Sequence, residues 1–375
     1  MEQCQKCIIP DSFPNITIED GLCSFCREQA SNVAKTRDVR GRDQLSALLK
    51  TRKTASYDCA VPLSGGKDSS YILYYMVREL NLKPLAIFFD NGFITEMAKR
   101  NIERICTALG VDLVVGKASP YRRKQLKEAL LMSGSLGQLV KYCGNCENNL
   151  RSFTLNEAAQ RNIDYLIWGS TDFEDTAQSF EASSPFGAKK FREKYGTFRY
   201  MAGKPLQHLQ KLAGSTGQWG NKLQAFGHGV KYLFYCLCDN YATKAPEGWR
   251  KLNPFLQVTF ARKPVQVVYF FDYVPYDPYR HIETLREELQ WEAPEGQEIR
   301  FDCKLASLKN VQYLLETGLT AFGFTLSTLI RNDLLQREEA IKRENRLRRR
   351  LLADCRQLAD QVGVDIDNVL KKIET

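Results

Sequence analysis

The segment that most constrains this chain is Ser64-Gly65-Gly66-Lys67-Asp68-Ser69. A short apolar run, residues 58–63, precedes it, and an apolar-periodic run that begins at Tyr71 follows it. This order predicts a strand, a glycine turn and the start of a helix. Glycines let the backbone approach an anion closely, and the first turn of a helix presents N–H groups and the positive end of its dipole. The segment therefore predicts a phosphate-binding loop. The simpler alternative is a strand-to-helix turn capped by Asp68 or Ser69.

The residues around this loop alternate between strand-like and helix-like patterns. Strands are expected at 59–63, 85–89, 113–115 and 165–168, and helices at about 70–80, 95–109 and 148–161. Such alternation predicts a parallel sheet with helices on both faces and ligands at the carboxyl ends of its strands. The loop directly follows the first of these strands, as that rule expects.

The rest of the chain has a different character. Residues 182–230 are rich in Gly, Lys and aromatic residues, which fits a long lid or a partly helical insertion. Residues 257–273 fit a strand or a helix, and helices are expected at 279–290, 304–317 and 333–361. The expected domains are a zinc ribbon at 1–30, a linker helix at 31–56, an α/β domain at 57–245 with the insertion, and a mostly helical region for substrate or a partner at 246–375.

Composition indicates the cellular setting. No run approaches the ~20 apolar residues of a membrane span, and the N-terminus has no apolar signal region. We therefore expect a cytoplasmic protein whose thiols stay reduced. The 12 cysteines then indicate metal sites, clusters or chemistry rather than disulfides.

The net charge of +9 does not decide the partner. Part of the basic excess lies at 342–350, where it predicts either a solvated helix face or a contact for RNA or another polyanion. A charge this modest attracts nucleotides and phosphorylated substrates equally well.

The first four cysteines have the spacing of a metal ribbon. Cys4-x-x-Cys7 and Cys23-x-x-Cys26 form two knuckles that can bring four thiolates to one tetrahedral ion. This segment is short and has few aliphatic residues, and it cannot bury a hydrophobic core. Metal binding would therefore supply its folding free energy, ~10–16 kcal/mol. We expect structural zinc, with an iron–sulfur cluster as the alternative.

The loop resembles the PP-loop, S-G-G-x-D-S, of the ATP pyrophosphatases, and the Walker spacing is absent. Together with Cys4-Gln-Lys-Cys-Ile-Ile-Pro10, Gly21-Leu-Cys-Ser-Phe-Cys26 and residues 94–102, it is similar to the N-acetyl sugar amidotransferases over residues 1–115. Residues 326–331 and 336–341 add weaker similarity. The resemblance implies an adenine nucleotide α-hydrolase-like α/β domain. It also implies conversion of an acetamido sugar to its amidine in surface-polysaccharide (lipopolysaccharide) biosynthesis, with ammonia from a separate glutaminase.

The middle of the chain is similar instead to the tRNA-thiolating PP-loop enzymes. Cys143-Gly-Asn-Cys146 opens a predicted helix, and residues 174–178 approximate a G-H-x-x-D-D-x-x-Q motif in which Ser170 replaces His and one residue is inserted. That resemblance implies a [4Fe–4S] cluster on Cys143, Cys146 and a third cysteine, for which Cys303 is the best choice. The alternatives are structural thiols, a sulfur-carrying thiol pair, or a second zinc site, whose fourth ligand is not evident because His208, His228 and His281 are scattered.

Both resemblances imply the same first step. An amide oxygen is a very poor leaving group, and adenylation replaces it with AMP. The loop would hold the ATP phosphates through its backbone N–H groups, its hydroxyls and the Lys67 ammonium, and Asp68 would hold Mg²⁺. The expected nucleotide-binding residues are Ser64, Gly65, Gly66, Lys67, Asp68, Ser69, Asp90 and Gly169.

Acids after the strand at 165–168 are further candidates. Asp172, Glu174 and Asp175 would face the same cleft, for Mg²⁺ binding or proton transfer, although capping or solvated roles fit each acid taken alone. The expected catalytic residues are Lys67, Asp68, Asp175, Cys143 and Cys146.

The sequence thus predicts an enzyme that adenylates a carbonyl oxygen with ATP and replaces it. The leading hypothesis is nitrogen transfer to an acetamido sugar with a glutaminase partner. The alternative is sulfur transfer to a tRNA base or small metabolite, with a sulfur-carrier partner. A zinc-ribbon regulatory or nucleic-acid-binding protein with a degenerate loop is a third hypothesis, which the intact loop disfavours.

Overall fold

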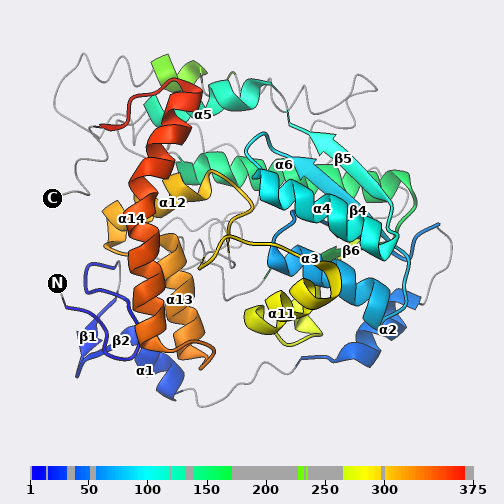
Figure 1. The fold of residues 1–375 in the computed structure, drawn as a ribbon, viewed down its shortest axis with the longest axis horizontal. Coiled ribbons are helices and arrows are strands. Elements are labelled where there is room, and N and C mark those ends of the chain that lie inside the picture. Colours follow the sequence, from blue (N-terminus) through cyan, green and yellow to red (C-terminus); the bar gives the residue numbers. More distant parts are fainter. Residues whose placement is uncertain are drawn as a thin grey trace, which may run out of the picture.

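The computed structural model describes most of the chain, and its helices and strands carry the labels of Figure 1. The described residues are 2–13, 16–31, 39–50, 56–118, 120–131, 139–170, 227–231, 234, 265–296 and 300–367. Most of the predicted insertion at 182–230 lies outside this set.

A five-stranded parallel sheet forms the centre of the fold (Figure 1). Its strands are β3 (Cys59–Pro62), β4 (Pro84–Asp90), β5 (Leu113–Lys117), β6 (Tyr165–Trp168) and β7 (Gln266–Tyr269). They lie in the order β5-β4-β3-β6-β7, so the chain starts in the middle, fills one side, and then crosses to the other. Ligands of open parallel sheets bind at such a reversal, beyond the carboxyl ends of the strands. The Ser64–Ser69 loop follows β3 and begins at this point.

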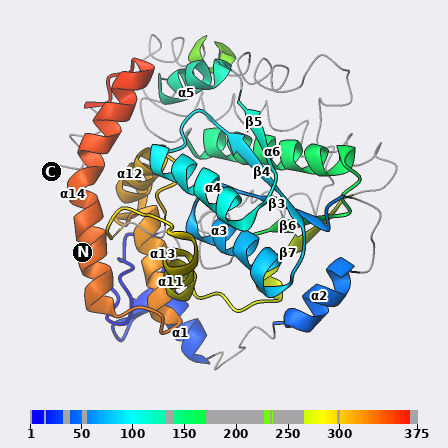
Figure 2. The same cartoon turned by 45° about the vertical axis from the view of Figure 1, so that its right-hand side comes forward.

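Helices cover both faces of the sheet, as Figure 2 shows. Their bounds are α3 (Lys67–Tyr74), continued by the π-helical η1 (Tyr75–Glu79), α4 (Glu96–Leu109), α5 (Tyr121–Leu131), α6 (Leu139–Gln160) and α11 (Pro278–Leu289). Cys59 and Val61 of β3 join an apolar core with residues of α3, α4 and α11. Ala60, between them, joins a second core with Ala158 of α6. Successive strand residues point to opposite faces, and this alternation separates the two cores.

A second group of elements joins the two ends of the chain. It comprises β1 (Ile18–Glu19), β2 (Leu22–Cys23), α1 (Ser24–Ser31), α12 (Ala306–Thr317), α13 (Ala321–Arg331) and α14 (Arg337–Val362), while α2 (Arg42–Lys50) and the 3-10 turn η4 (Phe270–Asp272) lie elsewhere. Figure 1 shows β1, β2 and α1 beside α13 and one end of α14. Ile8 and Phe13 share a core with Leu326 and Ala340.

The expected fold class is confirmed: a parallel sheet covered by helices, a buried four-cysteine group near the N-terminus, and a helical C-terminal region. The four strands expected between residues 59 and 168 are present within two residues of their predicted ends. Strand β7 lies C-terminal to the boundary expected at residue 245 and still joins the sheet. The α/β domain therefore takes residues from both sides of that boundary.

Two helices carried no usable sequence signal. In α5 the buried side mixes Arg122, Gln125 and Glu128 with apolar residues, so apolar residues alone do not mark its buried face. In α13 almost every residue is buried, so it has no polar face to create a period. Amphipathic periodicity requires one apolar and one polar face, and each of these helices lacks that contrast.

Within the described residues, no single helix has the length and apolar composition of a membrane span. The pair α12 and α13 meets both criteria only when taken together, and the two helices are bent by 77° at the break between them.

Candidate functional site

The phosphate-binding loop has a backbone that only glycine can supply at its second position. Gly65 has φ of +80°, and a Cβ built there would lie 2.2 Å from the carbonyl oxygen of Ala98. Gly66 is the N-cap of α3 and makes no side-chain cap hydrogen bond. The alternative in which Asp68 or Ser69 caps this helix is therefore wrong. The positive end of α3 instead begins at a glycine that leaves room for an anion.

Side chains from distant segments hold this loop in place. The carbonyl of Gly65 accepts hydrogen bonds from Trp291 Nε1 at 3.0 Å and from Asn101 Nδ2 at 3.3 Å. The Ser64 backbone N–H donates to Ser69 Oγ at 3.1 Å, and the two hydroxyls are 3.2 Å apart. The loop is thus fixed from both sides before any ligand binds.

Lys67 and Asp68 form a pair at the start of α3. Lys67 Nζ lies 2.7 Å from Asp68 Oδ2, and the Lys67 side chain is 1% exposed. Burial raises the pKa of Asp68, but the Lys67 charge and the neighbouring His281 ring outweigh it and hold the pKa below its ordinary value. The predicted roles of Lys67 on phosphate and of Asp68 on Mg²⁺ stay predictions. The structure adds that the two residues neutralise each other.

His281, which the sequence left among scattered histidines, lies at this site. Its Nδ1 is 3.5 Å from Asp68 Oδ1. His228 lies elsewhere and pairs with Glu128 at 2.5 Å, and His208 lies outside the described residues.

A short segment, residues 300–304, crosses the mouth of the loop. Asp302 Oδ2 lies 3.4 Å from the position that a Cβ on Gly66 would occupy. The segment is anchored by a β-bridge between Ile94 and Cys303 and by the Thr95 N–H, which donates to the Asp302 carbonyl at 3.0 Å. Asp302 was missed because a lone aspartate has no sequence signal. In the segment 300–304, only Cys303 was singled out from the sequence.

The structure brings Cys146 and Cys303 together through a shared neighbour. Asn91 Nδ2 lies 3.5 Å from Cys146 Sγ and 3.7 Å from Cys303 Sγ. Cys143 and Cys303 pack against one apolar cluster. Burial raises the pKa of both thiols, that of Cys303 to about 12. The long sequence separation of Cys303 is therefore no obstacle to a joint site.

The helix that carries Cys143 and Cys146 begins earlier than predicted. It starts at Leu139, so the two cysteines lie inside α6 rather than at its opening. Residues 132–138, just before it, lie outside the described residues. Within a helix, positions three apart share one face, so both sulfurs can face the same neighbours.

The four N-terminal cysteines form a second, separate site. Cys4, Cys7, Cys23 and Cys26 are buried, and their sulfur atoms all lie within 4.8 Å of one another. Across the described part of the chain, no other set of three or more Cys, His, Asp or Glu ligands meets that test. The hydrogen bond with Cys23 lowers the pKa of the Cys7 thiol. This group could hold a metal ion.

The remaining predicted residues have these places. Asp90 ends β4, accepts from the Gly92 N–H at 2.9 Å and lies 3.5 Å from Lys99 Nζ. Gly169 directly follows β6, and a Cβ there would lie 2.7 Å from Ile72 Cδ1. Asp172, Glu174 and Asp175 lie outside the described residues.

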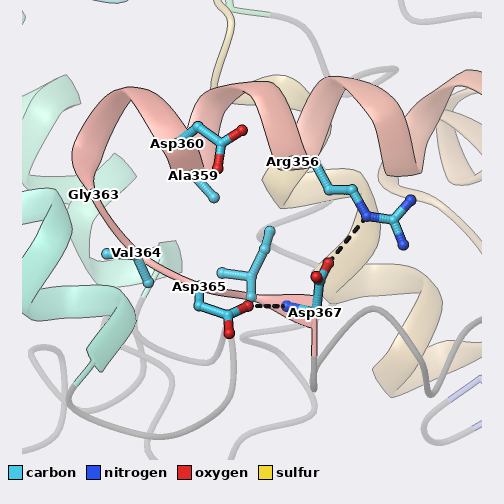
Figure 3. A pocket seen from close by; sticks show the side chains of 8 residues that line it. Arg356, Ala359, Asp360, Gly363, Val364, Asp365 and Asp367 are labelled. Carbon is cyan, nitrogen blue, oxygen red and sulfur yellow. Dashed lines mark hydrogen bonds and ion pairs between the residues drawn. The ribbon is translucent and has the colours of Figure 1, made fainter.

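The basic stretch at 342–350 is partly neutralised. Arg343 pairs with Glu339 at 2.7 Å and Arg348 with Glu344 at 2.8 Å on the same helix. These two arginines of the basic stretch therefore already have acidic partners on their own helix. A pocket at the far end of α14, drawn in Figure 3, is lined by Arg356, Asp360, Asp365 and Asp367 and by no predicted site residue.

The comparisons with known proteins are sparse. No protein-family model matches the chain, and no curated protein matches it. Among solved structures, the chain is similar to the NH3-dependent NAD synthetase from Campylobacter jejuni, at 16% identity and a TM-score of 0.29, over 55% of this chain and 94% of that chain.

Substituting the loop glycine tests the close backbone approach. Gly65→Ala should lower the free energy of unfolding, because the methyl group meets the Ala98 carbonyl. Gly92→Ala is the matched control, since Gly92 has φ of +82° with nothing within 4 Å of its Cβ position. The left-handed backbone alone costs about 1–2 kcal/mol in both variants. Denaturant unfolding should show a clearly larger loss for Gly65→Ala, and equal losses would contradict the role assigned to Ala98.

Removing one ligand tests the metal site. Cys26→Ser should lower the metal content of the purified protein and its melting temperature, because three thiolates hold a tetrahedral ion poorly. Cys106→Ser, at a buried cysteine of α4 outside the group, should keep the metal. Elemental analysis and thermal unfolding make the measurement. Unchanged metal content in Cys26→Ser would exclude this site as the metal holder.

Proposed function

We propose that the protein is an ATP-dependent adenylating transferase that acts on an acetamido sugar. The observation that carries the proposal is the loop geometry. A left-handed Gly65 and an uncapped Gly66 open the positive end of α3 at the reversal point of a parallel sheet. At this point a nucleoside triphosphate would meet backbone N–H donors and the positive end of the α3 dipole.

The proposed reaction has two balanced steps. The carbonyl oxygen of the acetamido group attacks the α-phosphorus of ATP, an O–P bond forms, and pyrophosphate leaves. Ammonia then attacks the activated carbon, a C–N bond forms, and AMP leaves with the original oxygen. The product is an amidine. Mg²⁺ carried with ATP would neutralise charge on the departing pyrophosphate, and a separate glutaminase would supply the ammonia.

The contact between the chain ends supports the sugar amidotransferase resemblance. The two weakly similar C-terminal segments, 326–331 and 336–341, pack directly on the N-terminal ribbon. Arg337 Nε donates to the carbonyl of Cys7 at 3.0 Å, and Arg331 Nη1 lies 3.9 Å from Cys7 Sγ. Residues similar to one family at opposite ends of the sequence thus form one structural unit.

Zinc is the metal we propose for the ribbon. The pairs Cys4–Cys26 and Cys7–Cys23 each have a sulfur–sulfur distance of 3.7 Å. A tetrahedral ion with bonds of ~2.3 Å places its sulfur ligands about 3.8 Å apart. Four protein ligands leave no open position, so the ion would stabilise the ribbon and take no part in adenylation.

Product analysis tests nitrogen transfer. The protein, a nucleotide-linked acetamido sugar, Mg²⁺-ATP and ammonium should together release pyrophosphate and AMP and add nitrogen-15 from labelled ammonium to the sugar. Lys67→Ala should slow this by about 10²–10³, the usual effect of losing one charge-stabilising group. Lys83→Ala, at an exposed lysine outside the loop, should match the unmodified protein. Pyrophosphate release without nitrogen incorporation would exclude the amidotransferase reaction.

A second candidate, sulfur transfer, is favoured by one specific observation. Asp302 Oδ2 lies 3.4 Å from the position that a Cβ on Gly66 would occupy, and the next residue, Cys303, shares Asn91 with Cys146. Consecutive Cα atoms are about 3.8 Å apart, so the backbone of Cys303 directly follows the residue that faces the loop. Cys143, Cys146 and Cys303 would hold a [4Fe–4S] cluster or carry a persulfide, and sulfur would replace the adenylated oxygen of a tRNA base or a small metabolite.

Purification without oxygen separates the two candidates. For the sulfur reaction, the protein should be brown, contain about four irons, the number in one [4Fe–4S] cluster, and lose them in Cys143→Ala. Cys355→Ala, a buried cysteine in the same apolar cluster, is the matched control and should keep the iron. Colourless protein with zinc only, active with ammonium, would exclude cluster-dependent sulfur transfer.

A further inference from the structure

Three titratable side chains stand in a row at the start of α3. Asp68 uses one carboxylate oxygen, Oδ2, for Lys67 Nζ at 2.7 Å, and its other oxygen faces His281 Nδ1 at 3.5 Å. The Lys67 and His281 side chains are each 1% exposed. Lys67 and His281 are therefore shielded from water, and their polar partners are protein groups.

Asp68 and His281 face each other but do not form a hydrogen bond in this structure. Among the described residues, neither Asp68 Oδ1 nor His281 Nδ1 has a hydrogen bond of normal geometry, and both atoms are buried. A buried polar atom without a partner is costly, so two such atoms facing each other indicate a bond that forms in another state of the site.

The imidazole ring is held in one plane by its aromatic neighbours. Its centroid lies 3.9 Å from that of Tyr71 and 5.5 Å from that of Phe271, with interplanar angles of 20° and 19°. Burial lowers the pKa of His281, so the ring is neutral near pH 7 and can donate a proton from one nitrogen. The packing therefore directs that donor edge toward Asp68.

ATP binding creates a charge conflict at this row. The Lys67 ammonium has three N–H donors, and a phosphate bound at the loop would draw it away from Asp68 Oδ2. If it leaves, a buried carboxylate loses its cation, which is strongly unfavourable unless another donor takes over. His281 Nδ1 is the group placed to do so.

We propose that His281 is a positioning residue for the adenylation reaction. When nucleotide binds, the His281 N–H closes on Asp68 Oδ1, which stabilises the carboxylate and releases Lys67 toward the phosphates. His281 does not touch the substrate. The inference rests on the proposed function, because it needs ATP at the Ser64–Ser69 loop.

Two substitutions separate the donor from the ring. His281→Phe keeps an aromatic ring in the stack and removes the donor, whereas His281→Asn keeps a donor near the Nδ1 position. The affinity for a non-hydrolysable Mg²⁺-ATP analogue should fall by about tenfold or more in His281→Phe, the usual effect of losing a hydrogen bond to a charged group. It should stay near the unmodified value in His281→Asn, and also in the control His228→Asn, which lies outside this site.

A double-mutant cycle decides whether the effect passes through Asp68. In an Asp68→Asn background no carboxylate needs a replacement partner, so adding His281→Phe should cause little further loss. If His281→Phe does not fold, His281→Gln serves the same cycle, since its amide reaches the Nε2 position instead of Nδ1. Equal losses in both backgrounds, or no recovery in His281→Asn, overturn the proposal. Absence of ATP binding by the unmodified protein overturns the proposed function itself.

Discussion

One carbonyl group, that of Gly65, ties together the parts on which the candidate site depends. It accepts hydrogen bonds from Trp291 and Asn101, which reach it from the segment after α11 and from α4. The Asn101 side chain also donates to the Glu292 carbonyl at 2.7 Å and accepts from the Glu292 N–H at 3.1 Å. Because Gly65 adopts a left-handed backbone, its carbonyl turns toward these donors, and the open start of α3 follows from that turn.

The predictable parts of this fold are those that depend on neighbours in the sequence. The strand at β3, the glycine turn and the start of α3 have local patterns, and so does the pair of cysteine knuckles. The helix α5 escaped because it buries charged and polar side chains such as Arg122. The start of α6 was misplaced because Gly144 and Asn145 are poor helix formers, yet the helix runs through them from Leu139.

The candidate site was only half predictable, for a physical reason. The loop residues can be recognised from their spacing in the sequence. His281, Asp302 and Asn91 cannot, because their partners lie far away in the sequence and meet them only in the folded chain. His281 lies more than 200 residues from Asp68, and its neighbours in sequence form an ordinary helix. Cys303 had a chemical signal as a thiol, and the β-bridge to Ile94 brings it to the site. Polar residues that meet across a fold have no period that sequence patterns can reveal.

The packing of the ribbon against α13 has a consequence for synthesis of the chain. Ile8 and Phe13 are made before α13, and their partner Leu326 is made about 300 residues later. At ~5–20 residues per second, that interval is about 15–60 s. During it the apolar side of the ribbon faces solvent. A nascent chain that stops before α13 would keep that side exposed, because Leu326 and its neighbours cover it only in the complete fold.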